Sequence, residues 1–269
     1  MYFYINRSDR SGSILQLMFC LISYCFKHKI SYHGIIGTNV WWYNKNYFKF
    51  IKDNFSFQNN MVDISLLKFI NFKELKNYSN VPSNHLICEI MVPGFNTNYF
   101  DDNINYYFDK TFLDLIHSNI MNKKYNIEKK IISVHIRRGD VKPWWRRRYT
   151  YDNVYINIID NIISNLENYE IHLFTEKNFN GDINLFKKKY KNIIFHIEIE
   201  SGFNKYENIF NDIIFMINSD YLICSKSSFS YVPALLNHSG IIYHNNKFWH
   251  KPLNKFLIYD DLTGNMIKN

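Results

Sequence analysis

Two arginines and an aspartate directly follow an apolar run near the middle of the chain. Residues 131–136 are mostly apolar or β-branched, which is typical of a strand buried on both faces of a parallel sheet. Arg137, Arg138 and Asp140 follow, and His135 is the penultimate residue of the run. Guanidinium groups present paired donors that suit phosphate oxygens. Because open α/β sheets bind ligands beyond the carboxyl ends of their strands, this segment predicts a clamp for a diphosphate.

Simpler interpretations of the same residues stay open. Arg-Gly-Asp also occurs as an exposed adhesion signal, although a buried strand leading into it argues against display. The two arginines could instead be solvated charges that pair with nearby acids, as most surface charges do. Asp140 could brace the arginines or accept a proton from a substrate hydroxyl. His135 could orient the clamp, contact a ligand, or only complete the hydrogen bonding at the strand end.

A serine-rich turn in the last quarter of the chain predicts a second anion site. Residues 221–224 form an apolar run suited to a buried strand, and Ser227 and Ser228 then open an apolar helical run. Hydroxyl groups and free backbone N–H groups at a helix start can bind an anion together. Serine caps are common, so the turn gains this meaning only beside the arginine clamp. Together the two places would close around one diphosphate.

The start of the chain holds a weaker version of this pattern. Residues 2–5 are β-prone, a polar loop that contains Gly12 follows, and apolar positions recur at helical spacing from Ile14 to Lys29. Ser13 is placed to cap this helix, whose N-terminus could receive a phosphate. One glycine is no nucleotide-binding fingerprint, so an ordinary strand–helix unit explains the segment more simply.

A regular alternation of strands and helices after residue 130 must position these side chains. Strands are expected at residues 131–136, 171–175, 193–199, 221–224 and 241–243, and helices at residues 151–166, 183–190, 210–218 and 228–236. This alternation predicts an α/β fold with a parallel, doubly wound sheet. In the first half, residues 85–91 are expected to form a strand and residues 102–121 a helix. The polar, basic stretch between the halves predicts an N-terminal domain at residues 1–125 and a C-terminal domain at residues 126–269.

Composition narrows the class of protein. Hydrophobic residues make up 46% of the 269, which excludes a disordered chain. The formal net charge of +8 favours anionic partners such as nucleotides, nucleic acid or acidic lipid. The four cysteines lie in apolar contexts without metal-ligand spacing. Neither a signal peptide nor a membrane-spanning segment is evident, so we expect a cytoplasmic protein.

The loop after the clamp combines tryptophans with arginines. Residues 141–150 contain Trp144 and Trp145, followed by the run Arg146 to Arg148. Arginines beside aromatic rings can stack on and neutralise single-stranded nucleic acid, so a nucleic-acid-binding protein without enzymatic activity is the rival hypothesis. The same residues could form a lid over a nucleotide sugar, or the tryptophans could simply anchor the loop.

Two segments resemble motifs of one enzyme family. Residues 135–140, His-Ile-Arg-Arg-Gly-Asp, match the His-x-Arg-Arg-Gly-Asp motif of the α-1,2-fucosyltransferases, glycosyltransferase family 11. Residues 227–237, Ser-Ser-Phe-Ser-Tyr-Val-Pro-Ala-Leu-Leu-Asn, resemble that family's Ser-Ser-Phe-Ser-Trp-Trp-x-Ala-x-Leu-Asn motif. Asp212 precedes Ser228 by sixteen residues, a spacing also seen in the related α-1,6-fucosyltransferases. The resemblance covers about residues 130–250, the half expected to bind the donor, and the N-terminal domain is expected to supply the acceptor site.

The resemblance implies a GT-B-like transferase with two Rossmann-like domains. It would move fucose from GDP-fucose to an oligosaccharide or glycoconjugate, with inversion and without a metal or other cofactor, and most simply in α-1,2 linkage to a galactoside. A GDP-sugar transferase of different linkage or donor sugar is the alternative enzyme, and no nucleic-acid partner is expected. Arg137 would stabilise the leaving GDP, Ser228 would hold its other side, and Asp212 would accept both N–H donors of the guanine edge.

Overall fold

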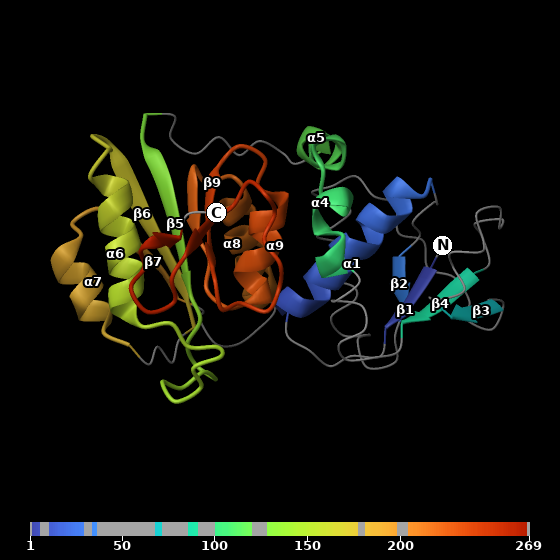
Figure 1. Ribbon diagram of the computed structural model, residues 1–269, viewed down its shortest axis with the longest axis horizontal. Coiled ribbons are helices and arrows are strands. Elements are labelled where there is room, and N and C mark those ends of the chain that lie inside the picture. Colours follow the sequence, from blue (N-terminus) through green and yellow to red (C-terminus); the bar gives the residue numbers. More distant parts are fainter. Residues whose placement is uncertain are drawn as a thin grey trace. The chain divides into compact units, whose positions relative to one another are not determined.

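The chain divides into two compact units, Met1–Met121 and Asn122–Asn269, in the computed structural model (Figure 1). The boundary expected from the sequence, at residue 125, lies close to this division. The structure describes residues 2–5, 11–29, 34–36, 68–71, 86–90, 100–119, 128–176, 181–197 and 204–267.

The C-terminal unit is built on one sheet of seven strands. They are β5 (Lys130–Ile136), β6 (Tyr169–Thr175), β7 (Ile193–Ile197), β8 (Tyr221–Ile223), β9 (Ile241–Asn245), β10 (Leu257–Tyr259) and β11 (Met266–Ile267). The strand order is β11-β10-β9-β8-β5-β6-β7, and all neighbours are parallel except β10 and β11. The predicted parallel sheet is confirmed. The sequence analysis missed β10 and β11 because strands this short show no clear alternation.

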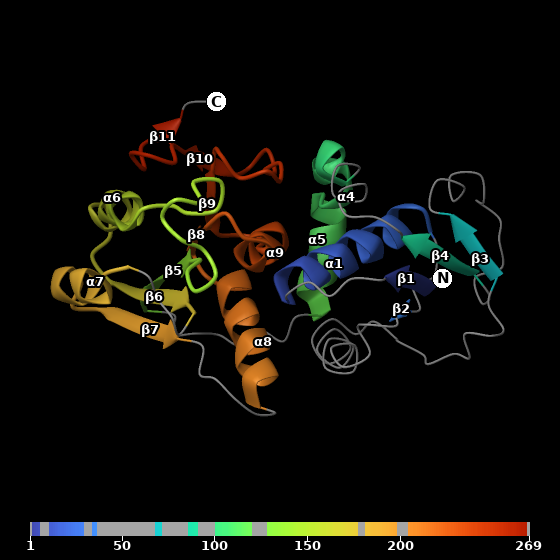
Figure 2. The same cartoon turned by 90° about the horizontal axis from the view of Figure 1, so that it is seen from below.

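Helices cover both faces of this sheet, as the doubly wound prediction requires. They are α6 (Asp152–Ile163), α7 (Ile183–Lys189), α8 (Asn204–Ile217) and α9 (Ser228–Leu236). Figure 2 shows α6 and α7 on one face and α8 and α9 on the other. Because side chains alternate along a strand, β5 sends one set of residues toward each layer. Ile132, Val134 and Ile136 pack with α6 and α7, whereas His135 faces α9.

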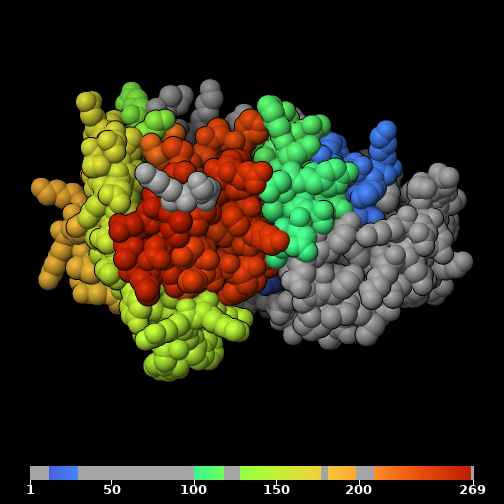
Figure 3. Space-filling model, in the orientation of Figure 1, coloured from blue at the N-terminus to red at the C-terminus, as the bar shows by residue number. Residues whose placement is uncertain are grey.

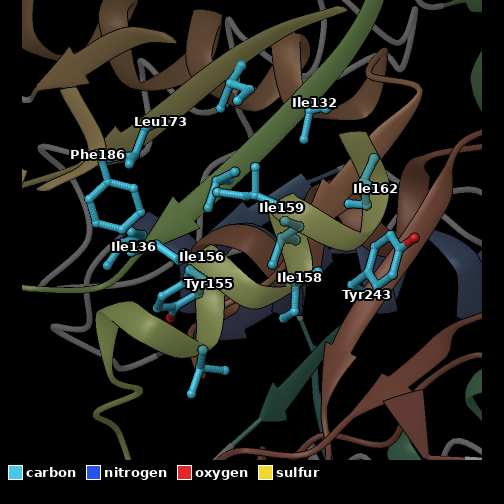
Figure 4. Close-up of a cluster of buried hydrophobic side chains, with 14 of the residues drawn as sticks. Ile132, Ile136, Tyr155, Ile156, Ile158, Ile159, Ile162, Leu173, Phe186 and Tyr243 are labelled. Atoms are coloured by element: carbon cyan, nitrogen blue, oxygen red, sulfur yellow. The ribbon is translucent and has the colours of Figure 1, made fainter. Parts of the chain in front are cut away.

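One apolar cluster in the core of this unit lies between the sheet and α6. Figure 4 shows Ile132 and Ile136 of β5 beside apolar side chains of α6, with Leu173 and Phe186 packed next to them. Burial of apolar side chains stabilises a fold by about 25 cal/mol for each Å² of apolar surface removed from water. The packing fixes the position of β5, and therefore of the residues that leave its carboxyl end.

The N-terminal unit contains a second, smaller parallel sheet. Its strands are β1 (Tyr2–Ile5), β2 (Gly34–Ile36), β3 (Lys68–Asn71) and β4 (Leu86–Ile90), in the order β2-β1-β4-β3. The helices described in this unit include α1 (Ser11–Lys27), α4 (Ile104–Tyr107) and α5 (Lys110–Asn119). None of the helices in the described ranges is long and apolar enough to cross a membrane.

Two expectations for this unit were wrong. Helix α1 begins at Ser11, so Gly12 and Ser13 lie in its first turn rather than in a loop before it. Glycine is destabilising mainly in the middle of a helix, so the first turn tolerates one. The helix expected at residues 102–121 is broken between α4 and α5, where the Asp109 carboxylate accepts from the Phe112 N–H at 3.0 Å. Helical spacing continues across this break, which hid it in the sequence.

Candidate functional site

The carboxyl end of β5 and the start of α9 lie together at one edge of the sheet. Strands β5 and β8 are neighbours, and Val134 pairs with Ile223. A ring nitrogen of His135, Nδ1, lies 2.8 Å from the Ser225 hydroxyl, and its ring centroid lies 5.1 Å from that of Phe229. The arginine segment and the serine turn that the sequence singled out therefore occupy the same place in the fold.

His135 is held neutral at this junction. Burial lowers the pKa of its imidazole to about 3, and the positive charges of Arg137 and Arg138 add to the shift. Only 5% of the residue is exposed. A neutral, buried ring that contacts Ser225 joins the strand to the turn before α9. Among the alternatives left open by the sequence, this geometry favours orientation of the clamp.

Arg137 retains hydrogen-bonding capacity at the end of β5. Its side chain is 14% exposed, and its Nη2 donates to Asp140 Oδ2 at 3.0 Å. The buried Nε has no hydrogen-bond partner among the described residues. A guanidinium group has five N–H donors, so Arg137 can bind an anion while Asp140 holds its orientation. Asp140 is therefore placed to brace Arg137.

Arg138 points into the protein instead. It is fully buried, and its guanidinium group donates to the carbonyl oxygens of Arg137 and Thr150 at 2.9 Å each and pairs with Asp152. It also lies 4.1 Å from the ring centroid of Tyr149. We had expected both arginines to face a ligand. The structure separates them because successive side chains leave a strand on opposite faces, and Arg138 falls on the face covered by α6.

Gly139 permits the turn that separates the two arginines from Asp140. Its φ of +77° lies in the left-handed region, and a Cβ there would overlap Oε2 of Glu176. Glu176 directly follows β6, so a second carboxylate stands at this edge of the sheet. The sequence analysis missed Glu176, although its place after a predicted strand was a usable signal.

We expect Gly139→Ala to destabilise the protein by about 1–3 kcal/mol, because it combines an unfavourable φ with the overlap at Glu176. Chemical denaturation of the variant measures the loss. A second variant, Gly139→Ala with Glu176→Ala, should recover only the part due to the overlap. Wild-type stability in Gly139→Ala alone would contradict this account of the turn.

The two serines at the start of α9 differ in the hydrogen bonding of their hydroxyl groups. Ser227 is the N-cap, and its hydroxyl accepts from the Phe229 N–H at 3.3 Å. The Ser228 hydroxyl makes no hydrogen bond with the described residues, although the residue is only 8% exposed. Ser227 therefore serves the helix, and Ser228 has its hydroxyl available beside the first backbone N–H groups of α9.

Asp212 lies farther along the sheet, on α8. Its carboxylate is 3.6 Å from Nδ1 of His196 on β7, which is separated from β5 by β6. The other ring nitrogen of His196 lies 2.8 Å from Nδ1 of His172, whose Nε2 is 2.7 Å from Glu170. Glu170, His172, His196 and Asp212 therefore form a row of neighbouring titratable side chains. The sequence analysis missed its histidines because their pairing depends on two separate strands.

His172 and His196 make the stability of the protein depend on pH. Burial lowers the pKa of His196 to about 4 and also lowers the pKa of His172. The unfolded chain therefore binds more protons between pH 6.5 and 4, and the free energy of unfolding should fall as pH falls through this range. His196→Phe should flatten the curve by at most about 1.4 kcal/mol per pH unit. Denaturation at several pH values tests this, and parallel wild-type and variant curves would contradict it.

The candidate site lies in the C-terminal unit. It brings together His135, Arg137, Asp140, Ser227 and Ser228, with Asp212 two strands away from β5. Gly12, which the sequence analysis included, lies in the N-terminal unit. The described residues contain no group of three or more His, Cys, Asp or Glu side chains that could hold a metal ion.

Comparison with known proteins finds solved structures with a similar fold, but no family model or curated protein with a matching sequence. No protein-family model matches the chain, and no curated protein matches it. Among solved structures, it is similar to a mutant of Arabidopsis thaliana FUT1 in complex with GDP, with a TM-score of 0.50 and 12% identity over 95% of this chain and 72% of that one. The chain has a GT-B-like fold. This confirms the fold class expected from the sequence.

Other solved structures of transferases are similar at lower scores. E. coli heptosyltransferase WaaC with ADP matches at a TM-score of 0.48 and 8% identity, over 98% of this chain and 94% of that one. Fucosyltransferase NodZ from Bradyrhizobium matches at 0.46 and 13% identity, over 87% of this chain and 91% of that one.

Proposed function

We propose that this protein is a glycosyltransferase that uses a nucleotide-diphosphate sugar, and that its donor is GDP-fucose. One observation carries the proposal. The 2.8 Å contact between His135 and Ser225 joins the end of β5 to the turn before α9, so Arg137 and Ser228 lie at one sheet edge. In α/β proteins this edge is where ligands bind. The GT-B-like fold and the two motifs that resemble fucosyltransferases support the same function.

Arg137 would act on the leaving group. As the bond between the sugar C1 and the donor oxygen breaks, negative charge grows on the diphosphate, and a positioned guanidinium group stabilises it. The Ser228 hydroxyl and the first N–H groups of α9 would bind the diphosphate from the other side. The acceptor hydroxyl would attack C1 opposite the diphosphate as the bond from C1 to the diphosphate oxygen breaks, inverting the anomeric centre, and the hydroxyl proton would pass to water. Because these groups supply positive potential, the proposal includes no metal or other cofactor.

Asp140 and Asp212 receive different roles. Asp140 accepts a hydrogen bond from Arg137, so we assign it to positioning the guanidinium group rather than to proton transfer. Asp212 would accept the ring N–H and the exocyclic amine of guanine, two adjacent donors that adenine lacks. His196, 3.6 Å from Asp212, would help to orient its carboxylate. Transfer to O2 of a galactoside is the linkage that the motif resemblance favours.

Thermal shift with different nucleotides tests the donor assignment. We expect GDP to stabilise the protein by about 2.7 kcal/mol at one hundred times its Kd, and ADP and UDP to stabilise it much less. Asp212→Ala should remove most of the preference for GDP. Equal stabilisation by all three nucleotides would contradict guanine recognition, and no stabilisation by any of them would overturn the proposed donor site.

A further inference from the structure

The loop that follows the clamp is an exposed aromatic and basic surface. This Trp-Arg loop comprises Val141–Thr150, and Figure 3 shows the light green segment that contains it projecting from the C-terminal unit. Trp144 is 73% exposed and Trp145 is 49% exposed. Large aromatic side chains are seldom left so open to water, and several close together indicate a surface that meets a partner.

The three arginines of the loop place cationic groups at the surface. Arg146, Arg147 and Arg148 are exposed, and none forms an ion pair with the described residues. Arg148 lies 5.5 Å from the ring centroid of Trp249, which is itself 47% exposed and extends the aromatic surface beyond the loop. The surface therefore combines flat apolar rings with unneutralised positive charge.

Buried charges hold the loop in place. Lys226 is fully buried, and its ammonium group donates to the Arg146 carbonyl oxygen at 2.8 Å and to Asp261 Oδ2 at 2.7 Å. Arg138 donates to the Thr150 carbonyl oxygen at the C-terminal end of the loop. Burying two cations is unfavourable unless their partners are well placed. These two buried cations therefore anchor the loop at its middle and at its C-terminal end.

Short-range hydrogen bonds shape the loop from within. The Trp145 N–H donates to the Lys142 carbonyl oxygen at 2.9 Å, and the N–H groups of Arg148 and Tyr149 both donate to the Trp145 carbonyl oxygen. These turns display the tryptophans and arginines on a preformed surface, and preorganisation of this kind reduces the entropy lost on binding.

The anchor also connects the loop to the proposed donor site. Lys226 lies in the same turn as Ser227 and Ser228, so the group that fixes the loop directly precedes the start of α9. A partner bound to the loop would be held near the sheet edge where the sugar is transferred. In a glycosyltransferase, the partner that must come to this edge is the acceptor.

We propose that the Trp-Arg loop binds an acidic glycan, a chain of sugar rings with carboxylate or similar anionic groups, and presents it as the acceptor. This inference rests on the proposed function. Indole faces suit the flat apolar faces of sugar rings, and guanidinium groups suit carboxylates. A single compact patch of cations fits this partner better than nucleic acid, which is usually held by aromatic rings and cations arranged along an extended groove.

A matched pair of polysaccharides tests the proposal. Polygalacturonate and its methyl ester share the same rings and differ in charge, so we expect the full chain to bind the first at least about tenfold more tightly. Arg146→Glu with Arg147→Glu should weaken binding of polygalacturonate by about tenfold or more. The control, Lys187→Glu with Lys188→Glu, makes the same change of charge on the exposed surface of α7 and should leave binding unchanged.

Further arms separate the alternatives. Equal binding of both polysaccharides, or wild-type binding by the arginine variant, would overturn the proposal. Tighter binding to a short oligothymidylate would assign the loop to nucleic acid, and tighter binding to phosphatidylserine vesicles would assign it to a membrane surface. Either result would also overturn the proposal. Stabilisation by GDP, measured on the same variants, tests the donor site separately. If GDP stabilised neither the wild type nor any variant, that result would count against the proposed function.

Discussion

Replacing Arg137 with alanine should reduce sugar transfer by about a hundredfold to a thousandfold while the protein stays folded. The expected loss is that of one positioned donor to a developing negative charge, about 3–4 kcal/mol of transition-state stabilisation. Arg137 makes one side-chain hydrogen bond with the described residues, to Asp140, and its side chain is 14% exposed. Its removal therefore leaves the core intact.

The rate of transfer from GDP-fucose, monitored as the release of GDP, measures this effect. The circular dichroism spectrum reports on the fold. Arg137→Lys is the informative companion, since it keeps the charge but loses the planar pair of donors. Partial activity in the lysine variant would indicate that charge matters more than geometry. Full activity in Arg137→Ala would remove the guanidinium group from the mechanism.

Replacing Arg138 with alanine should have the opposite outcome, a loss of stability. We expect the free energy of unfolding to fall by about 3–5 kcal/mol, because the change leaves the Asp152 carboxylate without its cationic partner in a mostly buried place. The Asp152 side chain is 15% exposed, whereas Arg138 is fully buried. The change also removes hydrogen bonds to the carbonyl oxygens of Arg137 and Thr150.

Denaturant titration of the purified variant measures this loss. Arg138→Ala with Asp152→Ala is the matched control, because removal of both charges avoids the unpaired carboxylate and should be less destabilising than the single change. A single variant as stable as the wild type would show that Arg138 does not anchor the loop.

The sequence places these two arginines on opposite faces of the strand, but it does not show what each face contacts. Strand alternation places Arg137 on the face of His135 and Arg138 on the face of Ile136. The apolar run before them identifies a buried strand, but not which face a particular helix covers. Only the packing of α6 against β5 brought Asp152 to Arg138 and made the second arginine a structural residue.

Other contacts depended on residues far apart in the chain. The carboxylate that a Cβ at Gly139 would displace belongs to Glu176, which follows a different strand. The pairing of His172 with His196 joins two strands, and the burial of Lys226 depends on Asp261 near the end of the chain. Local pattern carries no information about such contacts, since any of many segments could have supplied the partner.

The sequence by itself determined the alternation of strands and helices in the C-terminal unit, the buried strand before Arg137 and the capped helix start at Ser227. Each of these is encoded over a few consecutive residues, by apolar periodicity or by a capping hydroxyl. The tertiary structure alone decided that β5 and β8 are neighbours, and so that Arg137 and Ser228 share one sheet edge. Strand order reflects how whole elements pack, because the free energy of burying their faces is gained only when the sheet and its helices assemble.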